Sequence, residues 1–200
     1  MNQEQEPDWE GYYKAIEGRP PRPVFLDGLA LFEKSTALQP FAIDVGCGDG
    51  TETFHLLQNG WRVLAIDQQP AAVARVQSLV PPQLQRHLET RVAPFENLTL
   101  PPADFVYAGF SLPFCHPAKF DSLWAEMTAA IRPGGRFAGQ LFGIHDTWAD
   151  DKGMTFHTRE QVDALLTAFD VEFFNEVDED GSAVSGPKHW HVFHVLARKK

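Results

Sequence analysis

The residues best suited to chemistry form one short loop, Asp44-Val45-Gly46-Cys47-Gly48-Asp49-Gly50. Its three glycines allow the backbone to approach a ligand closely, because glycine has no side chain and tolerates unusual backbone angles. The loop follows the apolar run Phe41 to Val45 and precedes a helical stretch that starts near Gly50. Free N–H groups at the start of that helix would face the same ligand. The sequence therefore predicts a cofactor-binding loop at the end of a buried strand.

Two classes of cofactor use such a loop, the dinucleotides and S-adenosylmethionine (SAM). The dinucleotide pattern G-x-G-x-x-G requires a third glycine where this chain has Thr51. The acids Asp44 and Asp49 would also face a pyrophosphate, and the repulsion would cost roughly a few kcal/mol. SAM instead carries an ammonium and a sulfonium, which the same carboxylates attract. Charge therefore favours SAM.

The loop resembles motif I of class I SAM-dependent methyltransferases. Two further features are similar to this family: Asp67 at the end of the second predicted strand, and the turn Ile131-Arg132-Pro133-Gly134-Gly135 before the fifth. Over the whole chain the similarity is looser, and it extends to small bacterial methyltransferases of the tellurite-resistance type. The resemblance implies an enzyme that takes a methyl group from S-adenosyl-L-methionine and releases S-adenosyl-L-homocysteine.

The resemblance also implies which residues contact the cofactor. Asp67 matches the acidic residue that bonds the ribose hydroxyls in this family. Residues after the third predicted strand pack on the adenine, and residues after the fourth line the methionine end. Arg19, in the aromatic N-terminal stretch, is expected to pair with the methionine carboxylate. The predicted cofactor contacts are Arg19, Asp44, Gly46, Cys47, Gly48, Asp67, Gln68, Ala93, Phe95, Glu96, Gly109 and Ser111.

Three residues are candidates for a catalytic role: Tyr13, His116 and His145. Methyl transfer mainly requires alignment of the nucleophile with the methyl carbon and exclusion of water, so a base is needed only when the nucleophile is protonated. Each candidate has a structural alternative. Tyr13 can anchor an arm to the core, His116 can simply start a helix, and His145 can be an ordinary loop residue. We predict no metal site, because the other histidines have no ligand partners that the sequence identifies.

Alternating strands and helices must position these residues. Short apolar runs predict strands, and apolar stripes at helical spacing predict helices. The predicted strands are residues 41–45, 62–66, 87–92, 104–108, 136–142, 171–177 and 190–197. Helices are predicted over residues 23–38, 50–59, 70–80 and 117–131, and after the capping box of Thr158 and Gln161. The last two strands are expected to pair antiparallel across a loop of residues 178–188.

This order of elements predicts the fold class: α/β, with a Rossmann-like, doubly wound, mostly parallel seven-stranded sheet and a C-terminal antiparallel hairpin. The sequence contains no internal repeat and no long linker. We expect one methyltransferase domain over residues 1–200. In it, residues 1–38 form an N-terminal lid or helix and residues 39–200 form the catalytic core.

Composition narrows the range of partners. The formal net charge is −10, so nucleic-acid backbones and anionic membranes would repel the chain. The two cysteines, Cys47 and Cys115, do not make a disulfide framework, and their spacing does not match that of zinc ligands. The sequence has no signal-peptide pattern and no apolar run of about 18 residues. We therefore expect a cytoplasmic monomer or homodimer that acts on a small molecule and binds neither nucleic acid nor membrane.

Three functions remain open at this point. The leading hypothesis is a SAM-dependent methyltransferase with a small-molecule acceptor. The second is a non-catalytic SAM-binding regulatory module, which would share the same loop. The third is an NAD-type oxidoreductase, which Thr51 and the loop acids disfavour.

Overall fold

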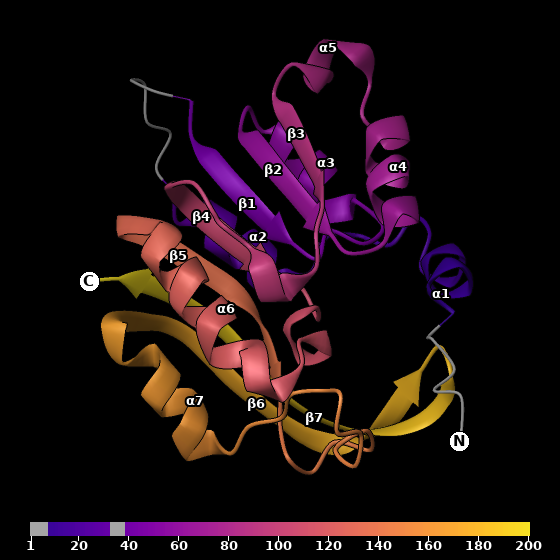
Figure 1. The fold of residues 1–200 in the computed structure, drawn as a ribbon, viewed down its shortest axis with the longest axis vertical. Coiled ribbons are helices and arrows are strands. Elements are labelled where there is room, and N and C mark those ends of the chain that lie inside the picture. Colours follow the sequence, from indigo (N-terminus) through magenta and orange to yellow (C-terminus); the bar gives the residue numbers. More distant parts are fainter. Residues whose placement is uncertain (1–7, 33–38) are drawn as a thin grey trace.

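The computed structural model describes residues 8–32 and 39–200, which fold around one seven-stranded sheet (Figure 1). The strand order is β3-β2-β1-β4-β5-β7-β6. Strands β1 to β5 are parallel, and β7 runs antiparallel between β5 and β6. Their bounds are β1 Phe41–Val45, β2 Arg62–Asp67, β3 Leu88–Val92, β4 Ala103–Ala108, β5 Ile131–Phe142, β6 Phe169–Ala183 and β7 Gly186–Lys199. The predicted fold class is confirmed.

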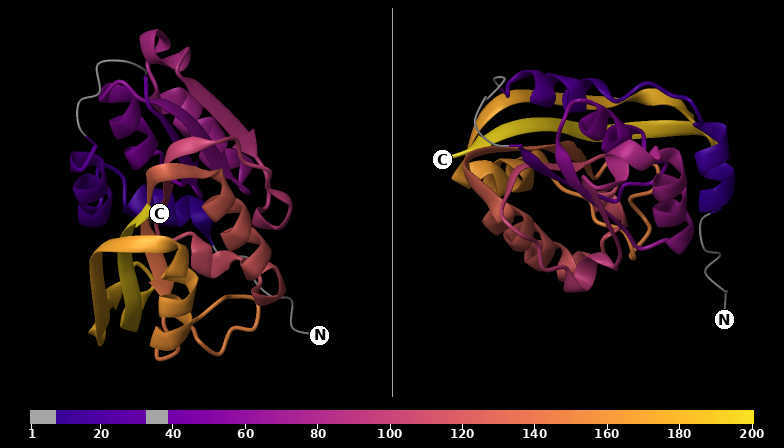
Figure 2. Two further views of the ribbon diagram at one scale, coloured as in Figure 1. Left: turned by 90° about the vertical axis from the view of Figure 1, so that its left-hand side faces the viewer. Right: turned by 90° about the horizontal axis from the view of Figure 1, so that it is seen from above.

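Helices cover both faces of this sheet (Figure 2). One face packs against α2 (Pro23–Ala30), α3 (Thr51–Gln58) and α4 (Pro70–Leu79) through buried side chains that include Phe25, Leu57 and Val76. The other face packs against α6 (Pro117–Ala130) and α7 (Arg159–Leu165) through Phe120, Trp124, Met127 and Val162. The remaining short elements are α1 Trp9–Ala15, α5 Pro82–Gln85, η1 Phe95–Asn97, η2 Leu112–Phe114 and η3 Leu166–Ala168.

Local sequence signals explain where the two best-defined helices begin. Pro117 occupies the first turn of α6, and the His116 ring accepts a hydrogen bond from the N–H of Ala118 at 3.2 Å. In α7 both bonds of the predicted capping box are present, between Thr158 and Gln161. These helix starts, which the sequence predicted, are confirmed.

Two predicted boundaries are wrong. The expected loop of residues 178–188 is instead part of a long hairpin, in which β6 and β7 pair up to Ala183 and Gly186. The acidic run Asp178 to Asp180 suggested a loop because acids are rare in strands, but β6 is an edge strand, where charged side chains face water. The helix predicted over residues 23–38 ends at Ala30, and residues 33–38 lie outside the described ranges.

The parallel register brings the carboxyl ends of β1, β2 and β4 to one edge of the sheet. Val45, Asp67 and Ala108 end these strands. The crevice beyond such strand ends is where open α/β sheets bind ligands. Across residues 8–32 and 39–200, no helix combines the length and the apolar character that crossing a membrane requires.

Candidate cofactor and acceptor site

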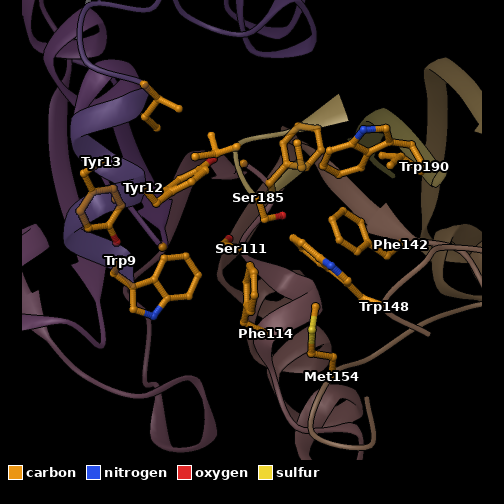
Figure 3. A pocket seen from close by; sticks show the side chains of 18 of the residues that line it. Trp9, Tyr12, Tyr13, Ser111, Phe114, Phe142, Trp148, Met154, Ser185 and Trp190 are labelled. Atoms are coloured by element: carbon orange, nitrogen blue, oxygen red, sulfur yellow. The ribbon is translucent and has the colours of Figure 1, made fainter. Parts of the chain in front are cut away.

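A cavity of about 1240 Å³ opens at the carboxyl edge of the sheet, and its walls differ in character from one side to the other. We call one side the loop half; it is lined by Gly46, Gly48, Asp67, Gln68, Phe95, Gly109 and Ser111. We call the other side the aromatic half; it is lined by Trp9, Phe114, Phe142, Trp148, Met154 and Trp190 (Figure 3). The volume exceeds the roughly 300–1,000 Å³ of a typical small-molecule site, so there is room for two ligands.

The glycine loop is shaped by its backbone. The N–H groups of Gly46 and Cys47 both donate to the carbonyl of Ile66, at 2.8 and 2.9 Å, which ties the loop to the end of β2. Gly46 has φ +79°, and a Cβ there would lie 2.2 Å from the Cβ of Ser111. Gly46 is therefore required both for its backbone angle and for the close approach of the segment after β4.

Asp67 is held at the cavity wall by backbone donors. Its carboxylate accepts the N–H of Gly48 at 3.0 Å and the N–H of Gln69 at 2.9 Å, and the residue is buried. Burial raises the pKa of Asp67, while the N–H donors oppose that shift. A fixed carboxylate at a cavity wall can accept hydrogen bonds from two neighbouring hydroxyl groups of a ligand.

Four residues expected to contact the cofactor do not line the cavity: Asp44, Cys47, Ala93 and Glu96. Asp44 and Cys47 are buried behind the wall because their side chains point into the protein. The Asp44 carboxylate accepts the hydroxyl of Thr53 at 2.6 Å, and burial raises the pKa of Asp44 to about 7. Ala93 packs on the core, and only Phe95 from its segment reaches the cavity. The shape of the cavity therefore does not support the predicted cofactor contacts of these four residues.

Arg19 lies at the cavity but already has carboxylate partners. Its guanidinium donates to both oxygens of Glu52, at 2.6 and 2.7 Å, and to Asp49 at 2.9 Å. This arrangement fastens the N-terminal segment to the start of α3. Arg19 therefore has less capacity for a ligand carboxylate than the sequence suggested.

Arg22, which the sequence analysis did not single out, also lines the cavity. Its guanidinium lies 4.3 Å from the centre of the Phe110 ring. Among the described residues no carboxylate pairs with Arg22, and its buried Nε has no hydrogen-bond partner. Phe110 itself has the unusual φ of +56°, and Gln140 accepts its N–H at 3.1 Å. Arg22 is thus a cation with unused bonding capacity at the cavity.

Of the three catalytic candidates, Tyr13 is the one that lines the cavity. Burial and the nearby Asp67 carboxylate raise the pKa of Tyr13, so its hydroxyl keeps its proton. His116 is used to cap α6. His145 lies outside the cavity, where its Nδ1 is 2.9 Å from Asp178. The sequence could not separate the three because each follows or precedes a predicted element.

His194 is a cavity residue whose role the sequence analysis missed. The sequence predicted only that the other histidines, His194 among them, form no metal site. Its Nδ1 lies 3.3 Å from the Gln140 amide, and its ring lies 6.0 Å from that of Phe110. Burial and the charge of Arg22 lower the pKa of His194, which keeps the imidazole neutral near pH 7.

A histidine and carboxylate cluster forms on the hairpin, outside the cavity. The β6–β7 register places Asp178 opposite His191, and the loop after β5 adds His145, so that candidate ligand atoms of all three lie within 4.8 Å. The sequence did not identify these partners because they come from three segments. Each group already has a hydrogen-bond partner, including Glu176 at 3.1 Å from His191 Nε2.

Comparison with known proteins gives a family match for the middle of the chain. Residues 43–139 match the family described as "Methyltransferase domain". A carboxy-S-adenosyl-L-methionine synthase of Vibrio parahaemolyticus is 32% identical over 97 residues, which are 46% of this chain and 40% of that protein. An uncharacterised methyltransferase of Synechocystis is 29% identical over 103 residues, which are 52% of this chain and 46% of that protein. The chain spans less than half the length of these curated relatives.

Solved structures match nearly the whole chain at low identity. TehB from Haemophilus influenzae superposes with a TM-score of 0.74 at 15% identity, over 94% of this chain and 66% of that chain. A 1,6-didemethyltoxoflavin-N1-methyltransferase from Burkholderia thailandensis superposes with a TM-score of 0.63 at 20% identity, over 96% of this chain and 84% of that chain. At these identities the similarity establishes the fold. Together with the domain match, it confirms the resemblance predicted from the sequence.

Proposed function

We propose that this chain is a class I SAM-dependent methyltransferase, a proposal supported by the methyltransferase-domain match at residues 43–139 and by the fold. The proposed reaction is transfer of the methyl group of SAM to a small-molecule acceptor. The loop half of the cavity binds the cofactor, and the aromatic half binds the acceptor. The whole chain, residues 1–200, acts as a single domain with α1 over the opening.

The observation that carries this proposal is the position of Asp67 beside the glycine loop. Two backbone N–H groups orient its carboxylate at the cavity wall, next to a loop where Gly46 excludes any side chain. This arrangement suits the two ribose hydroxyls of SAM. A dinucleotide would also offer ribose hydroxyls to an acid at this position, so the preference for SAM rests on Thr51 in place of the third glycine and on the methyltransferase-domain match.

The other residues of the loop half have proposed places along the cofactor. Phe95 and Gln68 lie beside the adenine and ribose. Gly46, Gly48, Gly109 and Ser111 lie along the methionine part. Arg22 rather than Arg19 takes the methionine carboxylate, because Arg19 is already neutralised by Glu52 and Asp49. Asp44, Cys47, Ala93 and Glu96 support these residues from behind.

The proposed roles of the protein in the reaction are alignment, exclusion of water and acceptance of a proton. When bound, SAM supplies a methyl group already activated by its sulfonium. The acceptor atom forms a bond to that carbon as the carbon–sulfur bond breaks, and the bonding electrons stay on sulfur. His194 accepts the acceptor's proton, since its lowered pKa keeps it neutral near pH 7. Tyr13 stays protonated and closes the cavity beside Gly48.

Calorimetry tests the cofactor assignment. SAM and S-adenosyl-L-homocysteine are expected to bind, and Asp67→Ala should weaken both by at least about tenfold. Asp104→Ala is the control, because Asp104 is a carboxylate near the start of β4, far from the loop. Its oxygens accept hydrogen bonds from the Arg132 guanidinium and the N–H of Phe41. Absence of binding at millimolar ligand, or equal binding by Asp67→Ala, contradicts the proposal. Enhanced NADH fluorescence on mixing would support the oxidoreductase alternative.

A transfer assay tests the reaction itself. Protein and methyl-labelled SAM are incubated with fractionated small-molecule extracts, and we expect label in at least one fraction. Activity should fall as pH drops through the lowered pKa of His194, and His194→Phe should remove that dependence. If the cofactor binds but no fraction ever accepts label, the chain is a SAM-binding regulatory module instead.

A further inference from the structure

We propose that the acceptor is a planar aromatic molecule without a cationic group, and that it binds between the rings of the aromatic half. This inference rests on the proposed function, because it names the substrate class for the same cavity. It is carried by four ring-bearing segments that are distant in sequence and meet at one place (Figure 3).

The rings form two facing walls. On one wall, Trp9 of α1 lies edge-on to Phe114 of η2, with ring centres 4.8 Å apart. On the other, Trp148 from the loop after β5 lies 6.2 Å from Trp190 of β7. Trp148 and Phe114 approach to 6.5 Å and join the two walls at their base. Aromatic guests gain stability from such faces and edges beyond the area that they bury.

A buried ion pair fixes the second wall from behind. The Lys188 ammonium lies 3.8 Å from the Trp148 ring centre and 4.5 Å from that of Trp190, and it bonds the Asp146 carboxylate. Asp146 also accepts the N–H of Trp148 at 3.0 Å. Lys188 and Asp146 are buried and do not line the cavity, whereas both indoles do. The ammonium therefore occupies one face of the indoles and leaves the other face to the ligand.

The same ion pair argues against a cationic guest. Aromatic rings attract cations through the negative charge of their faces, but Lys188 already uses this attraction at Trp148 and Trp190. A second cation on the opposite face of Trp148 or Trp190 would meet a like charge across the ring, which opposes the attraction of Asp8, Asp150 and Asp151 in the cavity lining. An uncharged aromatic guest has no such penalty. Met154, a flexible side chain on the same wall, can adjust to the outline of the guest.

Calorimetry with matched probes tests this inference. The protein is first saturated with S-adenosyl-L-homocysteine and then titrated with 2-naphthol, with its saturated counterpart decahydro-2-naphthol, and with choline. We expect 2-naphthol to bind at least about tenfold more tightly than the saturated compound, and choline not to compete. Equal binding of the two alcohols, or tighter binding of choline, overturns the inference.

Two variants locate the binding. Trp148→Leu is expected to weaken the binding of 2-naphthol at least about tenfold, while the affinity for S-adenosyl-L-homocysteine stays within about twofold of the parent's. Trp61→Phe is the matched control, since Trp61 packs in the core against Phe32 at 4.9 Å and should leave both ligands unaffected. If Trp148→Leu binds 2-naphthol like the parent, the inference is wrong. Failure of S-adenosyl-L-homocysteine to bind would instead contradict the proposed function.

Discussion

The loop half and the aromatic half of the cavity are built on different principles. The loop half owes its shape to backbone: Gly46 and Cys47 bond to Ile66, and Asp67 is held by two N–H groups. The aromatic half owes its shape to large side chains from α1, η2, β7 and the loop after β5. A backbone surface tolerates almost no substitution, whereas a side-chain surface can be altered residue by residue. The comparison therefore separates a fixed cofactor site from an adaptable acceptor site.

The largest expected effect concerns the ion pair behind the aromatic half. Asp146→Ala leaves the buried Lys188 ammonium without a carboxylate, and should lower the free energy of unfolding by about 3–5 kcal/mol. Urea denaturation measures this change. The double variant Asp146→Asn, Lys188→Met should recover most of the loss, because it removes both charges and keeps an oxygen that accepts the N–H of Trp148. If the double variant is as unstable as the single one, the ion pair does not determine the stability of this region.

Opposite dependences of stability on pH are expected at two buried sites, Asp44 behind the glycine loop and His157 against α6. Asp44, behind the loop, has a pKa of about 7 against 3.8 when unfolded, so its contribution is full below about pH 3.8 and is lost as pH rises through 7. Burial lowers the pKa of His157 to about 4 from 6.5, so its contribution is full above about pH 6.5 and is lost as pH falls toward 4. The full change amounts to about 4 kcal/mol for Asp44 and about 3 kcal/mol for His157.

Unfolding curves at about pH 4, 5.5 and 7 measure both dependences on stability. The free energy of unfolding of the parent minus that of Asp44→Asn should decrease as pH rises. The same difference for His157→Phe should increase as pH rises. His157 packs on Phe120 with ring centres 4.5 Å apart, so a phenylalanine there preserves the contact. Slopes of the same sign in both difference curves would contradict the assignment.

A third prediction tests how strictly the loop half depends on backbone. Gly46→Ala should reduce the affinity for S-adenosyl-L-homocysteine at least about 100-fold, because the new Cβ would displace Ser111 or the loop. Gly134→Ala is the matched control: its φ of +78° is nearly the same, but no atom lies within 4 Å of the added Cβ. Both variants carry the backbone strain, and only the first carries the clash. Equal affinity in the two would show that the clash is unimportant.

The smallest expected effect separates the two arginines of the cavity. Arg22→Gln should weaken SAM about tenfold with little change in melting temperature, because Arg22 has no carboxylate partner among the described residues. Arg19→Gln should instead lower the melting temperature, because it leaves Asp49 and Glu52 without their cation. Calorimetry measures the affinity of both variants for SAM, and thermal unfolding measures their melting temperatures. The reverse pattern would show that Arg19, and not Arg22, binds the methionine carboxylate of SAM.

The sequence could indicate the parts of the loop half because they are local. The glycines, the strand before them and Asp67 occupy short runs whose spacing indicates one turn and one strand end. It could not show that Asp44 faces inward to Thr53, since the side chain's direction depends on the packing of α3. The element order likewise predicted the seven strands, but not how far the hairpin extends.

The aromatic half could not be predicted in the same way. Trp9, Phe114, Trp148 and Trp190 have no common spacing, and they meet only because the fold brings four segments together. His189, His191 and His194 lie in or next to the last predicted strand, but the register alone decides which of them reaches the cavity. Arg22 gave no signal, since an isolated arginine among prolines has no distinctive pattern.

The edge strand β6 has a consequence for how copies of this protein meet. Its free side is a row of unpaired backbone groups to which another chain's strand could add. Six acids lie along it, namely Asp170, Glu172, Glu176, Asp178, Glu179 and Asp180. Asp170, Glu172 and Glu176 pair with arginines, so two such edges brought together near neutral pH would repel each other mainly at residues 178–180. The hairpin that closes the sheet thereby also keeps it from growing into a larger one.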